Sequence, residues 1–302
     1  MPLALKGVLL AVTAGVCWGT MAVFAQYLFT YCRFSAEDLT ALRMIGAGCL
    51  LLMVAQFLER QNIFSPFKDR RNIRDAFVYG IGVLMIQYTF FVAIHESNAG
   101  TAAIMVGFCP LFIIFYYVLF RQRKPSLIEI LCLLLALTGV FLIVTKGHFD
   151  SLDFSAKGVF WGLASAGFGA FCTIQPRSII ARTGVSFVVG WGMLIGGIIA
   201  CFFTHPFTMD VDWTIKAIGS YFFIIAFGTV AAFWCFLKST QFIPPSIASN
   251  LGSFEPFTAV LLTILFLGAS FNGFELVGAC MIIANMIILS WANGKRQQKG
   301  NS

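Results

Sequence analysis

Charged residues are scarce in this chain. Only 11% of its 302 residues are Asp, Glu, Lys or Arg, whereas soluble domains carry about 25%. Hydrophobic residues make up 59%, and the mean hydropathy is +0.87. A water-soluble fold of this length has to cover its surface with charge, so the composition excludes one and indicates an integral membrane protein.

Sequence signatures of metal sites, nucleotide sites and catalytic clusters are also missing. The nine cysteines are spaced singly without a CxxC pair, which indicates neither a zinc site nor a disulfide framework. No GxxxxGK[ST] motif occurs, so direct coupling to ATP is excluded within this chain. Glu129, Glu255, Glu275 and His95 are scattered over different apolar runs rather than paired. We therefore expect no cofactor, no metal ion and no enzyme.

Long uncharged runs fill most of the chain. A helix that crosses about 30 Å of hydrocarbon needs about 20 apolar residues. From Gly7 to Cys32 there is no charged residue or histidine, a run longer than the hydrophobic region of a secretory signal. We predict ten transmembrane helices, at residues 7–29, 39–58, 76–95, 99–120, 126–145, 158–180, 185–204, 216–237, 245–267 and 273–292.

The net charge of +7 comes from cations in short loops between these runs. Loops of this kind face anionic lipid on the cytoplasmic side, so we expect a lipid bilayer and no nucleic acid as partner. With a cytoplasmic N-terminus, 15 of the 20 Lys and Arg lie inside, four lie outside, and Arg43 lies within a span. The positive-inside rule thus predicts that both termini are cytoplasmic.

The two halves of the chain repeat one pattern. Small residues occupy every fourth position of the first predicted helix and again of the sixth: Gly7, Ala11, Gly15 and Gly19, then Gly158, Gly162, Ala166 and Ala170. We predict one five-helix repeat at 1–150, a second at 151–294, and a short basic tail at 295–302. Because five is odd, the second repeat is inverted, an architecture common in secondary transporters.

Several stretches resemble the EamA group of the drug/metabolite transporter superfamily, and the resemblance covers essentially the whole chain. They are residues 15–19 (GVCWG), Leu42-Arg43, 93–99 (AIHESNA), Pro110, Phe254-Glu255-Pro256 and 275–279 (ELVGA). The chain is also similar to the bacterial inner-membrane branch of amino-acid/amine transporter-like proteins. His95 departs from the more usual apolar residue there.

The resemblance implies an all-α, basket-like membrane protein of two inverted five-helix repeats around a central cavity. It places helices 5 and 10 at the periphery, where they are associated with dimer contacts, so a homodimer is one expected assembly. The implied location is the bacterial cytoplasmic (inner) membrane.

The implied function is secondary active transport of a small metabolite by alternating access, with an amino acid or amine as substrate and export as direction. Carriers of nucleosides, sugars or organic acids stay open as alternatives, and so, with less support, do a channel and a polytopic membrane enzyme.

Glu255 is the strongest single candidate for a residue of the functional site. It lies well inside the predicted span 245–267, where a carboxylate has to be protonated, paired or hydrated, and no Lys or Arg lies at a comparable predicted depth. A proton or a transported ammonium group would provide the partner, and a protonated structural acid is the alternative. Pro256 cannot donate to the carbonyl of Gly252, which leaves a polar backbone group beside the carboxylate.

Further candidates for substrate contact are polar or aromatic residues within predicted spans, namely Asn250, Gln87, Gln175, Trp18, Tyr88, Trp161 and Trp234. Interhelical hydrogen bonding or ordinary packing is the alternative for each. Pro110 and Pro256 are candidate gating hinges, with a simple kink as the alternative. We expect Arg43 to be an outer-end charge that pairs with Glu37 or Asp38, and contact with a substrate carboxylate is its alternative role.

Overall fold

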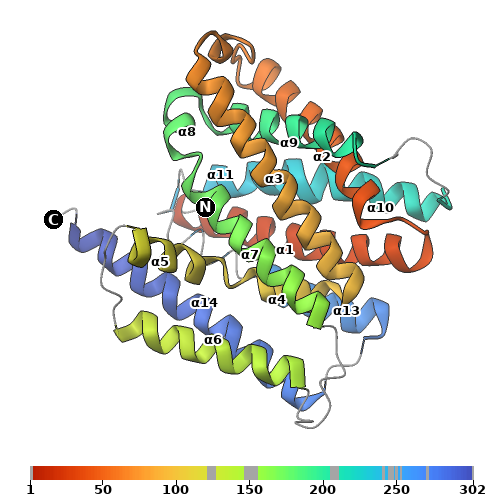
Figure 1. The fold of residues 1–302 in the computed structure, drawn as a ribbon, viewed down its shortest axis with the longest axis vertical. Coiled ribbons are helices and arrows are strands. Elements are labelled where there is room, and N and C mark those ends of the chain that lie inside the picture. Colours follow the sequence, from red (N-terminus) through yellow and green to blue (C-terminus); the bar gives the residue numbers. More distant parts are fainter. Residues whose placement is uncertain are drawn as a thin grey trace.

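The computed structural model describes residues 3–120, 127–145, 156–204, 211–239, 242–243, 248, 251, 254–269 and 272–300. Within these ranges all regular secondary structure is helical (Figure 1). This confirms the prediction of an all-α membrane fold.

The helices of the first half run in chain order as α1 (Leu3–Tyr31), α2 (Ala36–Met53), the π-helical η1 (Val54–Leu58), the 3-10 helix η2 (Ser65–Lys68), α3 (Arg70–Glu96), α4 (Ala99–Val106), α5 (Cys109–Phe120) and α6 (Leu127–Thr145). Those of the second half are α7 (Ala156–Ile174), α8 (Arg177–Thr183), α9 (Val185–Cys201), α10 (Ile215–Ile225), the π-helical η3 (Ala226–Ala231), α11 (Ala232–Ser239), α13 (Phe254–Leu267) and α14 (Gly273–Gly300).

Every predicted span overlaps one of these helices, although the number of full-length spans is lower than ten. Five helices in the described part of the chain are long and apolar enough to cross a membrane. A sixth would be α8 with α9, which are bent by 119° relative to each other. α6, α13 and α14 contain shorter apolar stretches. The count of ten spans therefore remains a prediction.

Two predicted boundaries differ from the structure for physical reasons. The span expected at 158–180 is divided, because Pro176 ends α7 at Ile174 and a new helix, α8, begins at Arg177. The last helix does not end near residue 292 but continues to Gly300. Basic residues favour a helical C-terminus, which agrees with the continuation of the helix into the predicted basic tail.

Polar residues fix several helix starts. Ser35, Asn98 and Thr214 each accept a hydrogen bond from a backbone N–H in the first turn of α2, α4 and α10. Asn272 and Glu275 form a reciprocal capping box before α14, with distances of 2.9 and 2.8 Å. The chain therefore marks where spans begin even though it contains few polar residues.

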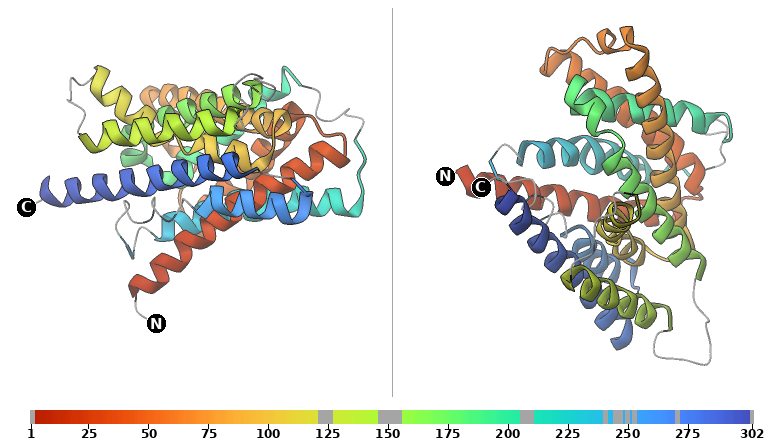
Figure 2. Two further views of the ribbon diagram at one scale, coloured as in Figure 1. Left: turned by 90° about the horizontal axis from the view of Figure 1, so that it is seen from below. Right: turned by 60° about the vertical axis from the view of Figure 1, so that its left-hand side comes forward.

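The closest helix pairs join one half of the chain to the other. α2 packs on α9, α3 on α7, α1 on α13 and α11, and α4 on α7 and α13. α6 lies along α14 at one side of the molecule, as two views agree (Figures 1 and 2). A two-fold relation between the halves maps α3–α7 onto α1–α11 and α4–α7 onto α1–α13. The pattern supports the proposed repeat.

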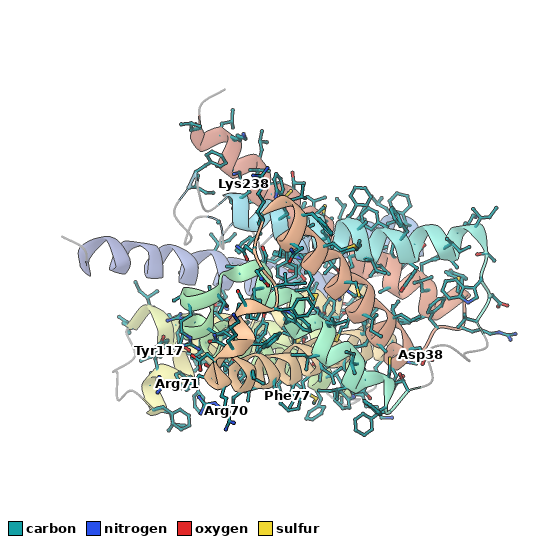
Figure 3. The ribbon with its side chains drawn as sticks, turned by 90° about the horizontal axis from the view of Figure 1, so that it is seen from above. Asp38, Arg70, Arg71, Phe77, Tyr117 and Lys238 are labelled. Carbon is teal, nitrogen blue, oxygen red and sulfur yellow. The ribbon has the colours of Figure 1, made fainter. Side chains whose placement is uncertain are left out.

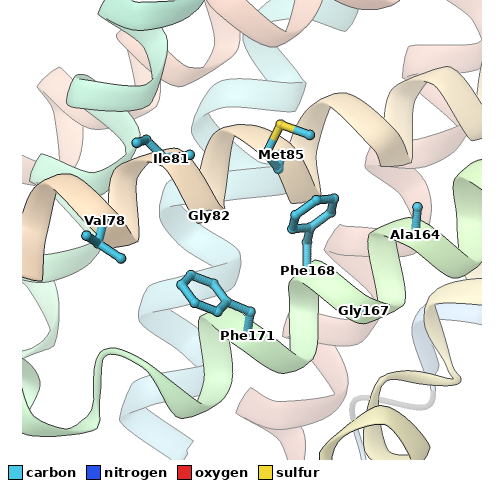
Figure 4. A pocket seen from close by; sticks show the side chains of 8 residues that line it. All are labelled: Val78, Ile81, Gly82, Met85, Ala164, Gly167, Phe168 and Phe171. Carbon is cyan, nitrogen blue, oxygen red and sulfur yellow. The ribbon is translucent and has the colours of Figure 1, made fainter.

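Large apolar side chains cover the outside of this bundle. Phe115, Leu131, Phe202 and Ile215 are 63%, 56%, 79% and 90% exposed. α3 and α7 flank an open groove of about 430 Å³, lined by Val78, Ile81, Gly82, Met85, Ala164, Gly167, Phe168 and Phe171 (Figure 4). Such a surface is suited to acyl chains rather than water.

The two ends of the bundle carry the polar groups. Figure 3 places Arg70, Arg71 and Tyr117 at one end and Asp38 at the opposite end. α2 and α3 are consequently antiparallel, with the start of each helix at opposite ends of the bundle.

Glycines on α1 allow α13 to approach closely. A Cβ at position 19 would lie 2.5 Å from the Glu255 carbonyl oxygen and 2.9 Å from the Ala259 nitrogen. A Cβ at position 15 would lie 3.3 Å from the Glu255 nitrogen. The small-residue pattern of the first helix therefore positions the first turn of α13, which carries Glu255.

Candidate functional site

Arg43 lies inside the bundle, not at its outer end. Its side chain is 2% exposed. Nε donates to Thr229 Oγ1 of η3 at 3.0 Å and Nη1 donates to Gln87 Oε1 of α3 at 2.7 Å. The Phe91 ring lies 5.2 Å from the guanidinium carbon. The prediction of an outer-end charge was wrong in this respect, because neutral partners on two other helices hold the guanidinium inward.

The partners expected for Arg43 are bonded elsewhere. Glu37 Oε1 accepts from the Tyr88 hydroxyl at 3.3 Å. Asp38 accepts from Ser35 at 2.8 Å, a contact within one helix start. Neither carboxylate pairs with Arg43, and both belong to the first turn of α2.

Glu255 lies in the first turn of α13 and is half-buried. Of the charged groups in the described part of the chain, Arg43 is the one whose electrostatic field reaches it. The two groups interact at longer range than the 4.0 Å of a direct ion pair.

α1 brings these two charges into one region. Gly19 contacts the backbone of Glu255 on one side. Met21 packs against Gly228 of η3, where a Cβ would lie 2.6 Å from the Met21 Cβ, and Gly228 directly precedes the Arg43 partner Thr229. The width of one helix thus separates the element that carries Glu255 from the element that anchors Arg43.

The predicted aromatic residues fall into three separate places. Trp18 packs on Phe233 and Phe236 of α11, at 5.5 Å between ring centroids for each. Tyr88 and Trp161 meet edge to face at 6.0 Å, next to Glu37. Trp18 and Trp161 nevertheless pack against one shared apolar cluster of buried residues.

Trp234, by contrast, is 50% exposed and faces a cavity of about 670 Å³ between α2, α9 and α11. The two π-helical segments, η1 and η3, both line this cavity, together with Glu59 and Lys238. The η3 residues that line it are Ala226, Val230 and Ala231, whereas Arg43 contacts Thr229.

Gln175 also lies away from Arg43 and Glu255. It follows the end of α7, and its Nε2 donates to the Asp75 backbone carbonyl at 3.1 Å. Arg182 joins the same cluster, with 2.7 Å to Asp75 Oδ2 and 2.9 Å to Asn72 Oδ1. Gln175 therefore follows the end of α7 rather than lying inside a continuous helix, because Pro176 ends the helix before it.

Both candidate hinge prolines lie in the first turn of a helix. Pro110 is the second residue of α5, directly after the break at 107–108 that ends α4. Pro256 is buried in the first turn of α13. A first turn tolerates proline because its N–H groups have no intrahelical acceptor. Gly252 and Asn250 lie outside the described residues, and the hinge role of the prolines stays a prediction.

Two residues of this site carried little sequence signal. Thr229 is a lone hydroxyl in the apolar stretch AFGTVA and is fully buried. Phe91 is one of 34 phenylalanines. Only the three-dimensional contact to Arg43 distinguishes either from packing residues.

The arrangement offers one buried cation with neutral partners and one half-buried carboxylate. The carboxylate can bind a proton or a cationic group of a ligand. Across the described residues no group of three His, Cys, Asp or Glu side chains is placed to hold a metal ion. All nine cysteines are free thiols.

Comparison with solved structures agrees with this helical arrangement. One crystal structure superimposes with a TM-score of 0.64 at 17% identity, covering 93% of this chain and 95% of that chain. At this identity the similarity shows a shared fold.

Sequence comparison identifies the family. The sequence profile of the EamA-like transporter family matches residues 5–145 and 156–291. The chain is 35% identical to the uncharacterized inner membrane transporter YicL of Salmonella typhimurium, over 96% of this chain and 97% of YicL. It is 24% identical to the uncharacterized transporter YwfM of Bacillus subtilis, over 92% and 90% of the two chains. It is 23% identical to the threonine/homoserine exporter RhtA of Salmonella typhimurium, over 82% and 80%. The chain therefore belongs to the EamA-like transporter family, within the drug/metabolite transporter superfamily.

Proposed function

We propose that this protein is a secondary active transporter that exports an amino acid or amine across the bacterial cytoplasmic membrane. Family membership supports transport. The name of YicL supports the inner membrane, and that of RhtA supports amino-acid export. The positive-inside rule supports cytoplasmic termini.

The observation that carries the substrate class is Glu255. Its side chain is half-buried in the first turn of α13, within a bundle of apolar helices. A carboxylate in a membrane interior costs several kcal/mol unless a cation or a proton satisfies it. An ammonium group of the substrate, or an exchanged proton, fulfils this need at the first turn of α13.

Alternating access is the mechanism that the helix pairing supports. Each of the central pairs joins one half to the other, so a relative movement of the halves would open one end and close the other. Pro110 and Pro256 occupy corresponding positions and are the proposed hinges. The homodimer stays a prediction, and the peripheral helices α6 and α14 are the elements it would use.

Counterflow in proteoliposomes tests the proposal. Purified protein would be reconstituted and loaded with unlabelled amino acids or amines, and uptake of the labelled compound would be followed at several pH values. We expect saturable exchange of at least one compound, and we expect Glu255→Gln to abolish it or to remove its pH dependence.

Glu59→Gln is the matched control. Glu59 is exposed and accepts a hydrogen bond from Ser186 at 2.8 Å, outside the Arg43–Glu255 region. Exchange that survives in Glu255→Gln with unchanged pH dependence would make Glu255 a structural acid. Absence of exchange for every amino acid and amine would contradict the proposed substrate class.

A further inference from the structure

The groove between α3 and α7 lies on the outside of the bundle. It has a volume of about 430 Å³ and is lined by apolar side chains (Figure 4). Val78, Ile81 and Phe171, which line it, are between 37% and 41% exposed. In a membrane protein the surroundings of such a groove are acyl chains rather than water.

The face of α3 that lines this groove continues into the first turns of the helix. Residues three, four or seven apart lie on one face of a helix. Arg71 and Arg74 therefore share a face with Val78, Gly82 and Met85, which line the groove. The apolar groove thus leads to a pair of cations at the end where α3 begins.

The end of α7 brings a third cation to this place. Gln175 Nε2 donates to the Asp75 backbone carbonyl at 3.1 Å, so the end of α7 meets the first turns of α3. Arg177 follows two residues later, and its Nη1 donates to the Tyr117 hydroxyl at 2.9 Å. Tyr117 and Arg71 lie at the same end of the bundle in Figure 3.

Two of these cations have no acidic partner. The Asp75 carboxylate bonds Arg74 at 3.1 Å and the guanidinium from α8 at 2.7 Å. Among the described residues, the side chain of Arg71 has no hydrogen bond or ion pair, and the partner of Arg177 is a neutral hydroxyl. Both side chains are exposed. Their guanidinium groups are therefore available to an anion, and phosphate is the anion that the arginine fork fits well.

We propose that the α3–α7 groove binds an acyl chain of an anionic phospholipid, and that Arg71 and Arg177 bind the phosphate of its headgroup. A single lipid satisfies both features, because its chain covers the apolar groove while its charge meets the two arginines. This end of the bundle is the predicted cytoplasmic end, where anionic headgroups attract Lys and Arg. The site is on the outer surface, so the inference does not depend on which solute is transported.

The test is lipid binding to the purified full-length protein in detergent, followed by native mass spectrometry. The two probes are dioleoyl-phosphatidylglycerol and dioleoyl-phosphatidylethanolamine, which have the same chains and differ in net charge. We expect the anionic lipid to bind about 10-fold more tightly to the wild-type protein. We expect inorganic phosphate at the lipid concentration not to displace it. These measurements need no variant, so they are decisive even if a substitution prevents folding.

A double variant, Arg71→Gln with Arg177→Gln, assigns the headgroup contact. Its preference for the anionic lipid should fall close to one, while the zwitterionic lipid should bind as before. The control is Arg33→Gln with Lys216→Gln, which removes two exposed cations near the opposite end of the bundle, where Asp212 lies 3.7 Å from Arg33. This control should keep the wild-type preference.

Gly167→Leu assigns the acyl chain. A Cβ at position 167 would meet the Phe112 ring at 3.8 Å, an ordinary contact, so the leucine can fill the groove. Binding of both lipids should weaken on the order of 10-fold, because the side chain displaces about two methylene groups of the lipid. Gly219→Leu, on the outside of α10, should bind both lipids as the wild-type protein does.

Several results would overturn the inference. They are equal binding of the two lipids by the wild-type protein, an unchanged preference in the arginine double variant, and unchanged lipid binding in Gly167→Leu. Displacement of the lipid by inorganic phosphate would reduce the site to an anion site without an acyl groove. A dimer that the spectra show for the wild-type protein but not for Gly167→Leu would assign the groove to a second copy of the chain instead.

Discussion

At the scale of single residues, the candidate site depends on how firmly the Arg43 guanidinium is held. Its neighbours are an amide, a hydroxyl and a ring face, none of which carries charge. A guanidinium so placed keeps its full charge available for a ligand. The anchors therefore matter for function although they need not touch the substrate.

Thr229→Val should loosen that anchor. The change removes the acceptor for Arg43 Nε while the side-chain volume stays nearly the same. We expect a loss of about 1.5–3 kcal/mol in the free energy of unfolding, typical of a buried hydrogen bond to a charged group, measured by denaturant titration in detergent.

Thr40→Val is the matched control for this change. Thr40 is 1% exposed, and its hydroxyl bonds the Ala36 carbonyl of its own helix. Loss of this hydroxyl should lower the free energy of unfolding by clearly less than Thr229→Val does. Equal effects of the two substitutions would mean that the Thr229 contact to Arg43 adds no stability.

The errors at this scale have a physical cause. The predicted depth of Arg43 depends only on the ends of its own span, and these carry no information about the helices that pack against it. Gln87 and Thr229 lie 44 and 186 residues away in the chain. A polar residue within a span was visible in the sequence, but the choice of its partner is a tertiary property.

At the scale of helices, close approach of α1 and α13 is the feature that sets the site geometry. Gly19→Ala should disrupt it, because the new Cβ would collide with backbone atoms that cannot rotate away. We expect a loss of stability of about 1–3 kcal/mol and reduced exchange activity. Thermal unfolding in detergent and counterflow would measure the two effects.

Gly219→Ala, on α10, provides the comparison. Among the described residues, no atom outside its own helix backbone and chain neighbours lies within 4 Å of a Cβ added there. This variant should be as stable as the wild-type protein or slightly more stable, because alanine favours helix. A stable and active Gly19→Ala protein would contradict the close packing described above.

A second prediction at this scale concerns the contact between α3 and α8. Arg182 on α8 bonds Asp75 and Asn72 on α3 and so joins the two halves at one end of the bundle. This contact has to break if the halves separate there. Arg182→Ala should therefore increase amide hydrogen exchange in residues 70–76 and 177–184.

Arg74→Ala controls for the loss of charge near Asp75. Arg74 pairs with Asp75 at 3.1 Å, but both residues belong to α3. Its removal should leave exchange in 177–184 unchanged. The same increase in both variants would show that the cluster reports local fraying rather than contact between the halves.

The existence of most helices could be predicted, because a long apolar run in a membrane protein has few alternatives to a helix. Their interruptions could be predicted less well. Pro176 marks a helix break in the sequence, although the predicted span 158–180 includes it, whereas the π-helical turns of η1 and η3 have no comparable marker. A wide turn depends on what packs around it, so the local sequence alone does not encode it.

At the scale of the whole molecule, the orientation in the membrane is the property that charge predicts. Cysteine labelling in intact cells tests it, in a variant without the nine native cysteines. Arg33→Cys should react with a membrane-impermeant maleimide, and Arg60→Cys should react only after lysis. The opposite pattern would reverse the predicted topology.

The two positions are well matched for this comparison. Both are exposed loop residues with a positive φ, 57° at Arg33 and 54° at Arg60. A cysteine would meet the same backbone constraint at each of them. A difference in labelling between the two variants would therefore report the side of the membrane that each position faces.

The pairing of the halves could be anticipated only in part. The small-residue pattern at Gly15 and Gly19 indicated close packing of the first helix, but it did not say which helix would face it. The structure shows α13 there. Helices that all present apolar surfaces have many acceptable neighbours, so complementary shape decides between them.

The wide turn of η3 has a consequence for how the chain can change in evolution. A π-turn holds one more residue than an α-turn, and here the Thr229 hydroxyl donates at 2.9 Å to Ile224, five residues earlier. Its proton is thereby committed, so the oxygen can only accept from Arg43. Deletion of a single residue from 226–231 would tighten the turn and rotate α11 by about 100° relative to α10. Length in this segment is therefore as constrained as residue identity: a one-residue deletion should be more harmful here than most substitutions.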